Sequence, residues 1–450
     1  MMKKVLIANR GEIAVRIIRT LKEMNIKSVA VYSTADKGAL HTALADESYC
    51  IGPPKSSESY LNIDRILAAC EKSGADAVHP GYGFLSETPE FAKRCEEAGI
   101  IFIGPTSELM QKMGDKAEAR ATMKEAGVPV IPGSTGVVEN LDEADKVVED
   151  IGYPVVIKAV SGGGGKGMRF VHDKENFEKN FKDAKKEAKN AFNDDRVYIE
   201  KYIPKARHIE VQIIGDGRGG AVHLYERDCS IQRNNQKLIE EAPARILSED
   251  SRAFITETTR KAVAALNYPG AGTVEYLYVE EEDAFYFIEM NTRVQVEHTI
   301  SEEITGVDIV REQLEVAFNQ RLTITQADIK INGFALECRI NAENSSNNFM
   351  PSPGPVKQLH LSLGRNVRVD THIFTGYNVP PNYDSMIAKI IVHHDSREAA
   401  IQKMTQVLDE TVIAPLKTNL DFQSFLMRHE NYLNNNVDIK FLVNNKIIDQ

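Results

Sequence analysis

The sequence lacks tryptophan, long apolar runs and any excess of basic residues. Its apolar stretches, such as residues 5–8 and 155–157, are far shorter than the ~20 residues that span a bilayer. The formal net charge of −11 argues against non-specific nucleic-acid binding, which depends on basic surface. We therefore expect no membrane segment and no nucleic-acid partner, and any phosphate-binding site must be local.

Cysteine is too sparse and too scattered for a disulfide framework or a zinc site. The chain has five cysteines, an odd number, and no CxxC pair. This usage is typical of reduced intracellular thiols, so we expect a cytoplasmic protein. Cys229 and Cys338 are predicted to be packing residues, because no nearby base would activate them.

Length and composition favour a globular enzyme of several domains. Single hydrophobic cores stop growing near about 250–300 residues, and this chain has 450. Apolar residues make up 42% of the chain and charged residues 26%, which argues against disordered and fibrous classes. We expect two or three domains that share a cleft.

Strand and helix patterns alternate through residues 1–114. The predicted strands are 4–8, 28–32, 77–79 and 101–103, and the predicted helices are 11–24, 63–73 and 90–98. This rhythm predicts a parallel α/β sheet. The first turn, from Asn9 to Glu12, is not GxGxxG, so the usual dinucleotide signature is absent.

Two further regions are predicted, which gives a multidomain fold of α/β and α+β type. Residues 115–329 are strand-rich after a helix at 107–126, and a charged helix at 177–190 suggests a mobile lid over about 131–203. Residues 330–450 are predicted to form an α+β unit, with strands 334–340, 367–370 and 386–393 and a helix at 397–408.

Four consecutive glycines, residues 162–165, follow an apolar strand that ends in Lys158. Glycines let backbone N–H groups wrap an anion, because no Cβ obstructs the approach. A lysine at the end of an apolar strand favours an anionic neighbour. The loop lacks the spacing of a Walker A motif, so a phosphate clamp and a flexible hairpin tip are both open interpretations.

Residues 273–279 and 284–291 have the pattern of two apolar strands joined by an acidic turn at 280–283. A hairpin centred on this turn places Glu275 opposite Glu289. Like charges directly opposite each other are destabilising unless something neutralises them. The pairing therefore predicts a bound cation between these two carboxylates.

The same hairpin would place Leu277 opposite Phe287 and Val279 opposite Phe285. The two carboxylates would then end an apolar stripe. Asn291 lies two residues after Glu289, on the same face of the predicted strand, so the candidate ligand atoms are all oxygens. Hard oxygen donors favour magnesium over zinc.

Polar residues recur at every second position in the segment 289–297. An extended strand would place these five side chains on one face: Glu289, Asn291, Arg293, Gln295 and Glu297. Such alternation usually marks a strand with a solvent-facing side. Here the face continues from the apolar residues Phe285 and Phe287 and points inward at its start, so we interpret the row as functional.

Four motifs, in this order along the chain, closely resemble the biotin carboxylase family: IANRGEIA at 7–14, HPGYGFLSE at 79–87, EMNTRVQVEH at 289–298 and MPSPG at 350–354. The resemblance runs over nearly the whole chain. It implies an α/β N-terminal domain, an ATP-grasp domain with a closing lid, and a C-terminal domain. These match the three predicted regions.

The resemblance also implies roles for individual residues. ATP ligands are implied at Lys116, Lys158, Gly164, Gly165, Glu200, Lys201, Ile203, His208 and Gln232. Ligands of Mg²⁺ or Mn²⁺ at the nucleotide are implied at Glu275, Glu289 and Asn291. Bicarbonate contacts are implied at Lys237, Arg293, Gln295 and Val296, the general base at Glu297, and biotin contacts at Arg339 and Tyr82.

Three positions depart from the family pattern. Thr299 follows His298 where the family usually has proline, and we expect this change to shift a loop. Asn234 and Asn235 stand where basic residues or histidine are usual, so no ATP contact is assigned to Asn235. The segment 414–416 replaces a glycine-containing turn, which implies altered packing or dimer contacts.

The implied reaction is the carboxylation of biotin by ATP and bicarbonate, through carboxyphosphate. Glu297 would deprotonate bicarbonate, and Arg339 would stabilise the biotin anion. The chain contains no Met-Lys-Met biotinylation sequence, so biotin is expected on a separate carrier protein, with separate carboxyltransferase subunits. The resemblance implies a homodimer and the first half-reaction of acetyl-CoA carboxylase; another acyl-CoA, pyruvate or urea is the alternative acceptor.

Two other classes of function remain possible on sequence grounds. Another ATP-grasp ligase would share the ATP and magnesium residues but would not need biotin. A catalytically silent scaffold would keep the fold. The intact acidic and basic positions argue against the scaffold, and a requirement for biotin separates the two ligases.

Overall fold

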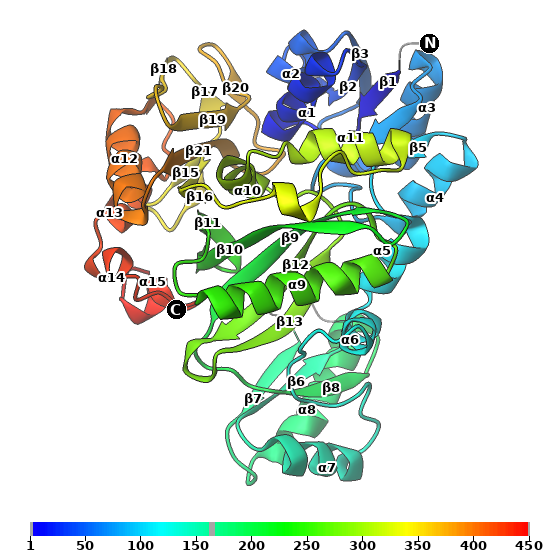
Figure 1. Ribbon diagram of the computed structural model, residues 1–450, viewed down its shortest axis with the longest axis vertical. Helices are drawn as coiled ribbons and strands as arrows, with labels where there is room; N and C mark the ends of the chain where they lie inside the picture. Colours follow the sequence, from blue (N-terminus) through cyan, green and yellow to red (C-terminus); the bar gives the residue numbers. More distant parts are fainter. Residues whose placement is uncertain (1–2, 162–166, 449–450) are drawn as a thin grey trace.

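The computed structural model describes residues 3–161 and 167–448, and it arranges three regions around a central sheet (Figure 1). The glycine loop, with Gly164 and Gly165, lies outside the described residues. Within the described ranges, none of the helices combines the length and the apolar character of a membrane span. The prediction of a multidomain α/β and α+β fold is confirmed.

The N-terminal region is a parallel sheet with helices on its faces, in the strand order β3-β2-β1-β4-β5. Its strands are β1 (Lys4–Ile7), β2 (Lys27–Ser33), β3 (Glu47–Gly52), β4 (Ala77–His79) and β5 (Ile101–Phe102). Its helices are α1 (Gly11–Glu23), α2 (Leu40–Leu44), α3 (Ile63–Ser73) and α4 (Pro89–Glu97). The prediction missed β3, because this edge strand carries little apolar sequence.

The helix predicted over 107–126 is two helices, α5 (Ser107–Gly114) and α6 (Lys116–Glu125). Asp115 between them has an extended backbone, with φ −80° and ψ 115°. Its carboxylate accepts the N–H groups of Ala117 and Glu118, both at 2.9 Å. An N-cap of this kind starts a new helix, so the single-helix prediction was wrong.

The region predicted as a lid is a small layered unit that projects at the bottom of Figure 1. Its strands are β6 (Val155–Ala159), β7 (Met168–Val171) and β8 (Val197–Lys201), and its helices are α7 (Leu141–Ile151) and α8 (Phe177–Phe192). Phe177, Phe181 and Ala184 of α8 are buried in its core. The charged residues of α8 occupy the other side of the helix, as an amphipathic helix requires.

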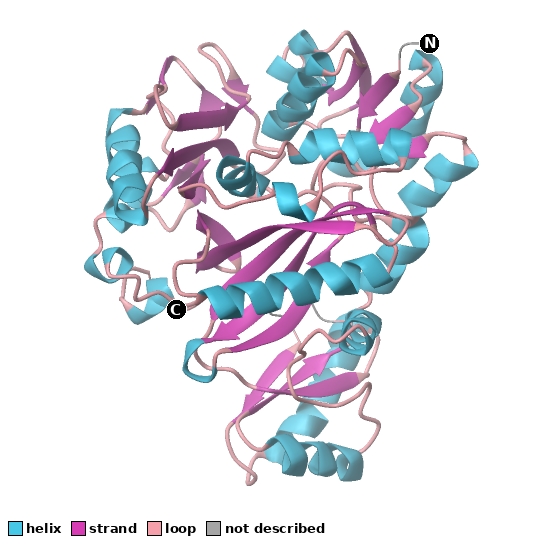
Figure 2. Cartoon of the chain, in the orientation of Figure 1, coloured by secondary structure: helices cyan, strands magenta, loops and turns pink. Residues whose placement is uncertain are grey.

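The central sheet has eight strands, in the order β13-β12-β9-β10-β11-β14-β21-β19. Their bounds are β9 (Arg207–Asp216), β10 (Ala221–Arg233), β11 (Gln236–Ala242), β12 (Pro269–Val279), β13 (Ala284–Asn291), β14 (Phe334–Asn341), β19 (Val367–Thr371) and β21 (Met386–His394). Figure 2 shows helix α9 (Glu249–Ala265) lying along this sheet.

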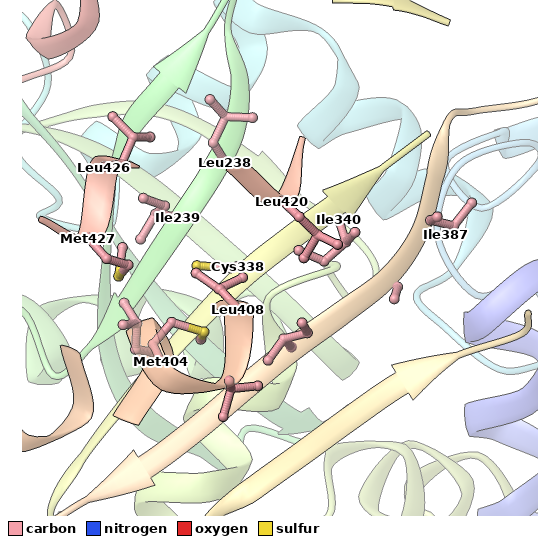
Figure 3. Close-up of a cluster of buried hydrophobic side chains, with 14 of the residues drawn as sticks. Leu238, Ile239, Cys338, Ile340, Ile387, Met404, Leu408, Leu420, Leu426 and Met427 are labelled. Atoms are coloured by element: carbon pink, nitrogen blue, oxygen red, sulfur yellow. The ribbon is translucent and has the colours of Figure 1, made fainter. Parts of the chain in front are cut away.

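Strands β11 and β14 pair antiparallel, so the sheet continues from the middle region into the last. Leu238 and Ile239 of β11 pack in one cluster with Cys338 of β14 and Met404 of α12 (Arg397–Glu410) (Figure 3). The remaining helices are α10 (His298–Thr305), α11 (Ile309–Asn319), α13 (Leu420–Met427), α14 (Glu430–Leu433) and α15 (Phe441–Asn444). The short strands are β15 (Glu343–Asn344), β16 (Met350–Pro351), β17 (Gly354–Pro355), β18 (Gln358–His360), β20 (Asn378–Val379) and β22 (Val412–Ala414).

The predicted hairpin exists, and Glu275 pairs with Glu289 across it. Beyond this pair the register shifts, so Tyr276 faces Phe287 and Tyr278 faces Phe285. The predicted pairs of Leu277 with Phe287 and Val279 with Phe285 were therefore wrong. The reason is a bulge between Glu275 and Tyr276, which sequence spacing cannot locate.

The buried side chain of His79 is predicted to make the stability of the protein sensitive to acid. Burial lowers the pKa of His79 to about 3, and its Nδ1 accepts the Gly81 N–H at 3.0 Å. The unfolded chain binds a proton near pH 6.5 where the folded chain does not. We therefore predict that the free energy of unfolding is unaffected by His79 above about pH 6.5 and falls toward pH 3, by up to about 1.4 kcal/mol per pH unit.

Urea unfolding between pH 5 and pH 8 tests this prediction. The comparison variant is His79→Asn, whose side-chain oxygen can still accept the Gly81 N–H. The loss of stability from pH 7.5 to pH 5 should be smaller in the variant. Equal losses in the two proteins would contradict a role for His79.

Candidate active site

Lys237 lies at the centre of a cluster of carboxylates brought together from four segments. Its Nζ donates to Glu210 at 2.5 Å, to Glu297 at 2.6 Å and to Glu275 at 3.0 Å. Burial opposes the charge on Lys237, but the three carboxylates outweigh burial and raise its pKa well above the ordinary value. The centre of the sheet therefore holds a permanent cation among acids.

Glu275 is held ionised by its neighbours. Its oxygens lie 3.0 Å from His208 Nε2, and they accept Asn291 Nδ2 at 2.9 Å and Gln295 Nε2 at 2.8 Å. Burial favours the neutral acid, yet Lys237 and His208 hold the pKa of Glu275 well below its usual range. Burial also disfavours the charge on His208, but Glu275 raises its pKa to about 9. His208, predicted to contact the nucleotide, and Glu275, predicted to bind the metal ion, are therefore direct neighbours.

The paired carboxylates suit a hard cation. Burial and the charge of Glu275 raise the pKa of Glu289. Asn291 adds an amide oxygen, which accepts Arg293 Nη2 at 2.9 Å. Carboxylate and amide oxygens are the donor types that magnesium prefers, and the magnesium site expected from the hairpin at Glu275, Glu289 and Asn291 stays a prediction.

Glu297 is a buried carboxylate held between two cations. It is only 2% exposed, and its two oxygens lie 2.6 Å from Lys237 Nζ and 3.0 Å from Arg339 Nη2. Burial would raise the pKa of Glu297, but Lys237 and Arg339 keep it below the usual range. An ionised carboxylate in this position can accept a proton from a small bound acid.

Arg339 faces the same centre from β14. Its Nε donates to Glu240 at 2.6 Å, and burial raises the pKa of Glu240 to about 7. The guanidinium is thus shared between Glu240 and Glu297, which fixes its plane. Its remaining N–H groups are donors that a ligand anion can use.

The polar row from Glu289 to Glu297 was predicted to lie on one extended strand, and this prediction was wrong. Strand β13 ends at Asn291, and helix α10 begins at His298. Strand β12 runs on past Thr273, the partner of Asn291, to Pro269, but β13 leaves it after Asn291. The chain turns inward instead, and Gln295 and Glu297 reach the cluster from a bend.

Arg293 leaves this bend toward the N-terminal region. Its Nε donates to Glu87 Oε2 at 2.7 Å, and Glu87 also accepts the Thr292 N–H. Glu87 was part of the motif at 79–87, but no role was predicted for it. The contact connects residues 292 and 293 to the N-terminal region, and Arg339 reaches the same site from the third region.

Arg227 and Glu210 are functional candidates that the sequence analysis missed. Arg227 is completely buried, and its guanidinium donates to Glu210 (2.6 Å), Gln212 (2.7 Å), Gln295 (2.7 Å), Ser301 (3.0 Å) and Thr273 (3.2 Å). Two signals could have found them. Three charged residues in a row, 226–228, interrupt an apolar strand, and polar residues alternate at 208, 210 and 212.

The predicted nucleotide residues of the lid lie apart from this cluster. Lys158 donates to Glu200 at 2.5 Å, so the lysine at the strand end does have an anionic neighbour. Lys201 instead donates to the backbone carbonyls of residues 152 and 153, at 3.2 and 2.9 Å. Lys116 begins α6 and is exposed, and its charge acts against the rise in the pKa of Glu289. Ile203 follows β8 and is half-buried.

Three other predicted site residues make no hydrogen bond to the carboxylates around Lys237. Gln232 donates to the Cys229 carbonyl at 2.8 Å and lies 3.0 Å from His208 Nδ1. The Tyr82 hydroxyl donates to Glu12. Val296 meets the buried Lys389, whose Nζ donates to its carbonyl at 2.6 Å.

The structure explains two of the departures from the family pattern. Asn234 and Asn235 have φ values of 51° and 61° and form the tight turn between β10 and β11. Thr299 lies in α10, where its hydroxyl donates to Glu337. Cys229 and Cys338 are buried with raised pKa values, which fits packing residues.

Comparison with known proteins identifies the same three regions. Residues 1–110 match the family "Biotin carboxylase, N-terminal domain", residues 115–325 match "Carbamoyl-phosphate synthase L chain, ATP binding domain", and residues 337–444 match "Biotin carboxylase C-terminal domain". Biotin carboxylase 1 of Bacillus subtilis (strain 168) is 50% identical over 442 residues, 98% of each chain.

Two further relatives differ in their stated roles. A pyruvate carboxylase component of Methanothermobacter thermautotrophicus is 50% identical and is matched over 96% of this chain and 87% of its own. The biotin carboxylase domain dimer of Hydrogenobacter thermophilus 2-oxoglutarate carboxylase, solved with MgADP, ADP and bicarbonate, superposes with a TM-score of 0.91. It is 44% identical over 99% of this chain and 98% of that one.

Proposed function

Because this chain belongs to the biotin carboxylase family, an ATP-dependent ligase family, we propose that the carboxylate cluster is the site where it activates bicarbonate and carboxylates biotin. The observation that supports this most is Glu297, a buried carboxylate held ionised between Lys237 and Arg339. A base flanked by two cations suits a substrate that is itself an anion.

Bicarbonate is a weak nucleophile, so it must be positioned and deprotonated. We assign the positioning to Lys237, Arg293, Gln295 and the Val296 backbone. Glu297 removes the proton as an oxygen of bicarbonate attacks the γ-phosphate of ATP, which forms carboxyphosphate and ADP. Arg227 holds the side chain of Gln295 at 2.7 Å, so this partner is oriented before substrate arrives.

Phosphoryl transfer needs positive charge around the nucleotide. We assign Lys116 and Lys158 to the phosphates, and Glu275, Glu289 and Asn291 to Mg²⁺ or Mn²⁺. A metal ion bound there would supply charge neutralisation at the phosphates. His208 and Gln232, with Glu200 and Lys201 of β8 and Ile203 just after it, complete the proposed nucleotide site.

Carboxyphosphate then breaks down beside biotin. The products are carbon dioxide and phosphate, and the phosphate takes the proton from the ureido nitrogen of biotin. Arg339 stabilises the enolate-like oxygen that develops, and the deprotonated nitrogen attacks carbon dioxide. Tyr82 is assigned to the biotin side of the site.

The three regions are proposed to act as domains with bounds 1–114, 115–329 and 330–450. The family matches, which end at 110, 325 and 444, support these bounds. The lid, residues 131–203, would close over the nucleotide and exclude water from carboxyphosphate. Gly164 and Gly165 are assigned to the lid loop by resemblance alone.

Biotin is proposed to arrive on a carrier protein, and carboxybiotin to leave to a separate carboxyltransferase. Acetyl-CoA is the proposed final acceptor, as in acetyl-CoA carboxylase; the pyruvate carboxylase relative supports pyruvate as the alternative. The dimeric relative supports a homodimer. The five free cysteines fit the proposed cytoplasmic location.

ATP hydrolysis with and without bicarbonate and free biotin tests the proposal. We expect turnover only with bicarbonate, stimulation by biotin, and transfer of labelled carbon from bicarbonate to biotin. A carboxylate ligase of another specificity would hydrolyse ATP without any requirement for biotin. A silent scaffold would show no turnover under any of these conditions.

Replacing Arg339 by methionine is predicted to separate the two half-steps. Arg339 contacts none of the proposed metal ligands, and Glu297 keeps its pairing with Lys237 when Arg339 is replaced, so carboxyphosphate formation should be less affected than biotin carboxylation. We expect biotin carboxylation to fall about a hundredfold, while bicarbonate-dependent ATP hydrolysis is largely retained. Equal losses in both assays would contradict a role confined to biotin.

A further inference from the structure

Lys389, a buried lysine of β21, joins the two sides of the proposed site. Its side chain has no exposed surface, and its Nζ donates to the Val296 carbonyl at 2.6 Å. The same Nζ lies 3.4 Å from Glu12 Oε1. Val296 immediately precedes Glu297, so a lysine from the last region fixes the backbone next to the proposed base.

Glu12 carries this connection to the N-terminal region. It lies in α1 within the IANRGEIA motif, for which the proposed chemistry has no use, and it is 3% exposed. Its Oε1 accepts the Tyr82 hydroxyl, and its Oε2 is buried without a partner among the described residues. A continuous path therefore runs from Tyr82 through Glu12 and Lys389 to Val296.

Stability alone is a weak explanation for this arrangement. A buried ion pair loses about as much hydration energy as it gains by attraction, and apolar residues of similar size often stabilise a core equally well. An ion pair with hydrogen bonds instead provides geometric specificity, because its attraction is favourable only for a narrow range of distances and angles between the partners. Lys389 is also the register partner of Arg339 across β14 and β21, so it is adjacent to the proposed biotin residue.

We propose that Lys389 and Glu12 are positioning residues that hold the Tyr82 hydroxyl and the Val296 backbone in a fixed relation. The distance between the biotin side and the bicarbonate side of the site is thereby fixed by one chain of polar contacts, which passes through all three regions. This inference rests on the proposed function, because it takes Tyr82 and Val296 as contacts of the two substrates.

Kinetics of Lys389→Met, Tyr82→Phe and the double variant test the coupling. Loss of the Lys389 donor frees the Val296 carbonyl, so KM for bicarbonate should rise about tenfold, with a smaller change in kcat. Tyr82→Phe should raise KM for biotin in the wild-type background and have little further effect once Lys389 is methionine. Glu12→Gln, which keeps the shape of the side chain, should reproduce part of both changes.

Ile391→Ala is the matched control. Ile391 is completely buried two positions along the same strand, and it contacts neither Val296 nor Glu12 through a polar group. It should lower Tm without changing either KM. Unchanged KM values in folded Lys389→Met, or fully additive effects of the two substitutions, would overturn the proposal.

Amide hydrogen exchange of the segment 294–298, measured without substrates, separates this inference from the proposed function. Faster exchange of this segment in Lys389→Met, but not in Ile391→Ala, supports positioning by Lys389. Equal exchange in all three proteins overturns it. A wild-type protein with no bicarbonate-dependent turnover would overturn the proposed function instead, whatever the exchange result.

Discussion

Glu297→Gln is expected to lower bicarbonate-dependent ATP hydrolysis and biotin carboxylation by about 10²–10⁴-fold, the usual contribution of a positioned general base. Glutamine keeps the shape of the side chain but cannot accept the bicarbonate proton. It also removes the charge that balances Lys237 and Arg339 in the wild-type site. Steady-state rates at saturating ATP, with bicarbonate varied, measure the effect.

Glu337→Gln is the matched control for this prediction. Glu337 is a buried carboxyl on β14, two positions from Arg339, and burial raises its pKa to about 8. It is therefore largely protonated near neutral pH, so an amide changes its charge little. We expect near wild-type rates for Glu337→Gln. Comparable losses in the two variants would attribute the effect of Glu297 to general damage of the buried acidic cluster.

Arg227→Met is expected to destabilise the protein by about 3–5 kcal/mol, the typical cost of removing one partner of a buried ion pair. The variant leaves Glu210 without the Nε contact at 2.6 Å and removes the donor that orients Gln295. Glu210 then depends on Lys237 alone among the strong donors. Urea unfolding measures the loss of stability, and KM for bicarbonate measures the loss of orientation.

Arg207→Met is the control that separates a loss of stability from a loss of function in Arg227→Met. Arg207 is also buried, 4% exposed, and pairs with Asp228 at 2.8 Å, but it contacts none of the proposed substrate residues. Both variants should unfold at lower urea concentrations. Only Arg227→Met should raise KM for bicarbonate, and the same rise in Arg207→Met would refute an orienting role for Arg227.

Local sequence pattern predicted most elements of the parallel sheet and the eight-stranded sheet. Strands such as β4 and helices such as α3 were predicted to the residue, because their apolar periodicity is strong. The prediction of element boundaries and strand register failed where the conformation of a single residue decided them. Asp115 capped a new helix, and a bulge beside Glu275 shifted the hairpin by one position.

The sequence determined the composition of the site. Hairpin symmetry alone placed Glu275 opposite Glu289, since strand pairing is a short-range property that spacing encodes. The resemblance to the biotin carboxylase family named Lys237, Arg293, Glu297 and Arg339. No signal in the sequence showed that these residues approach one another, because their separations along the chain carry no information about distance in space.

Only the tertiary structure decided how the polar row from Glu289 to Glu297 works. The row was predicted as one strand face, but it leaves the sheet after Asn291 and curls toward Lys237. The physical reason is that residues 292–297 contact side chains from segments distant along the chain, such as Glu87, Arg227 and Lys237, and these contacts hold them away from β12. The identities of the polar residues are thus written in the sequence, whereas their convergence depends on which distant side chains the folded chain brings beside them.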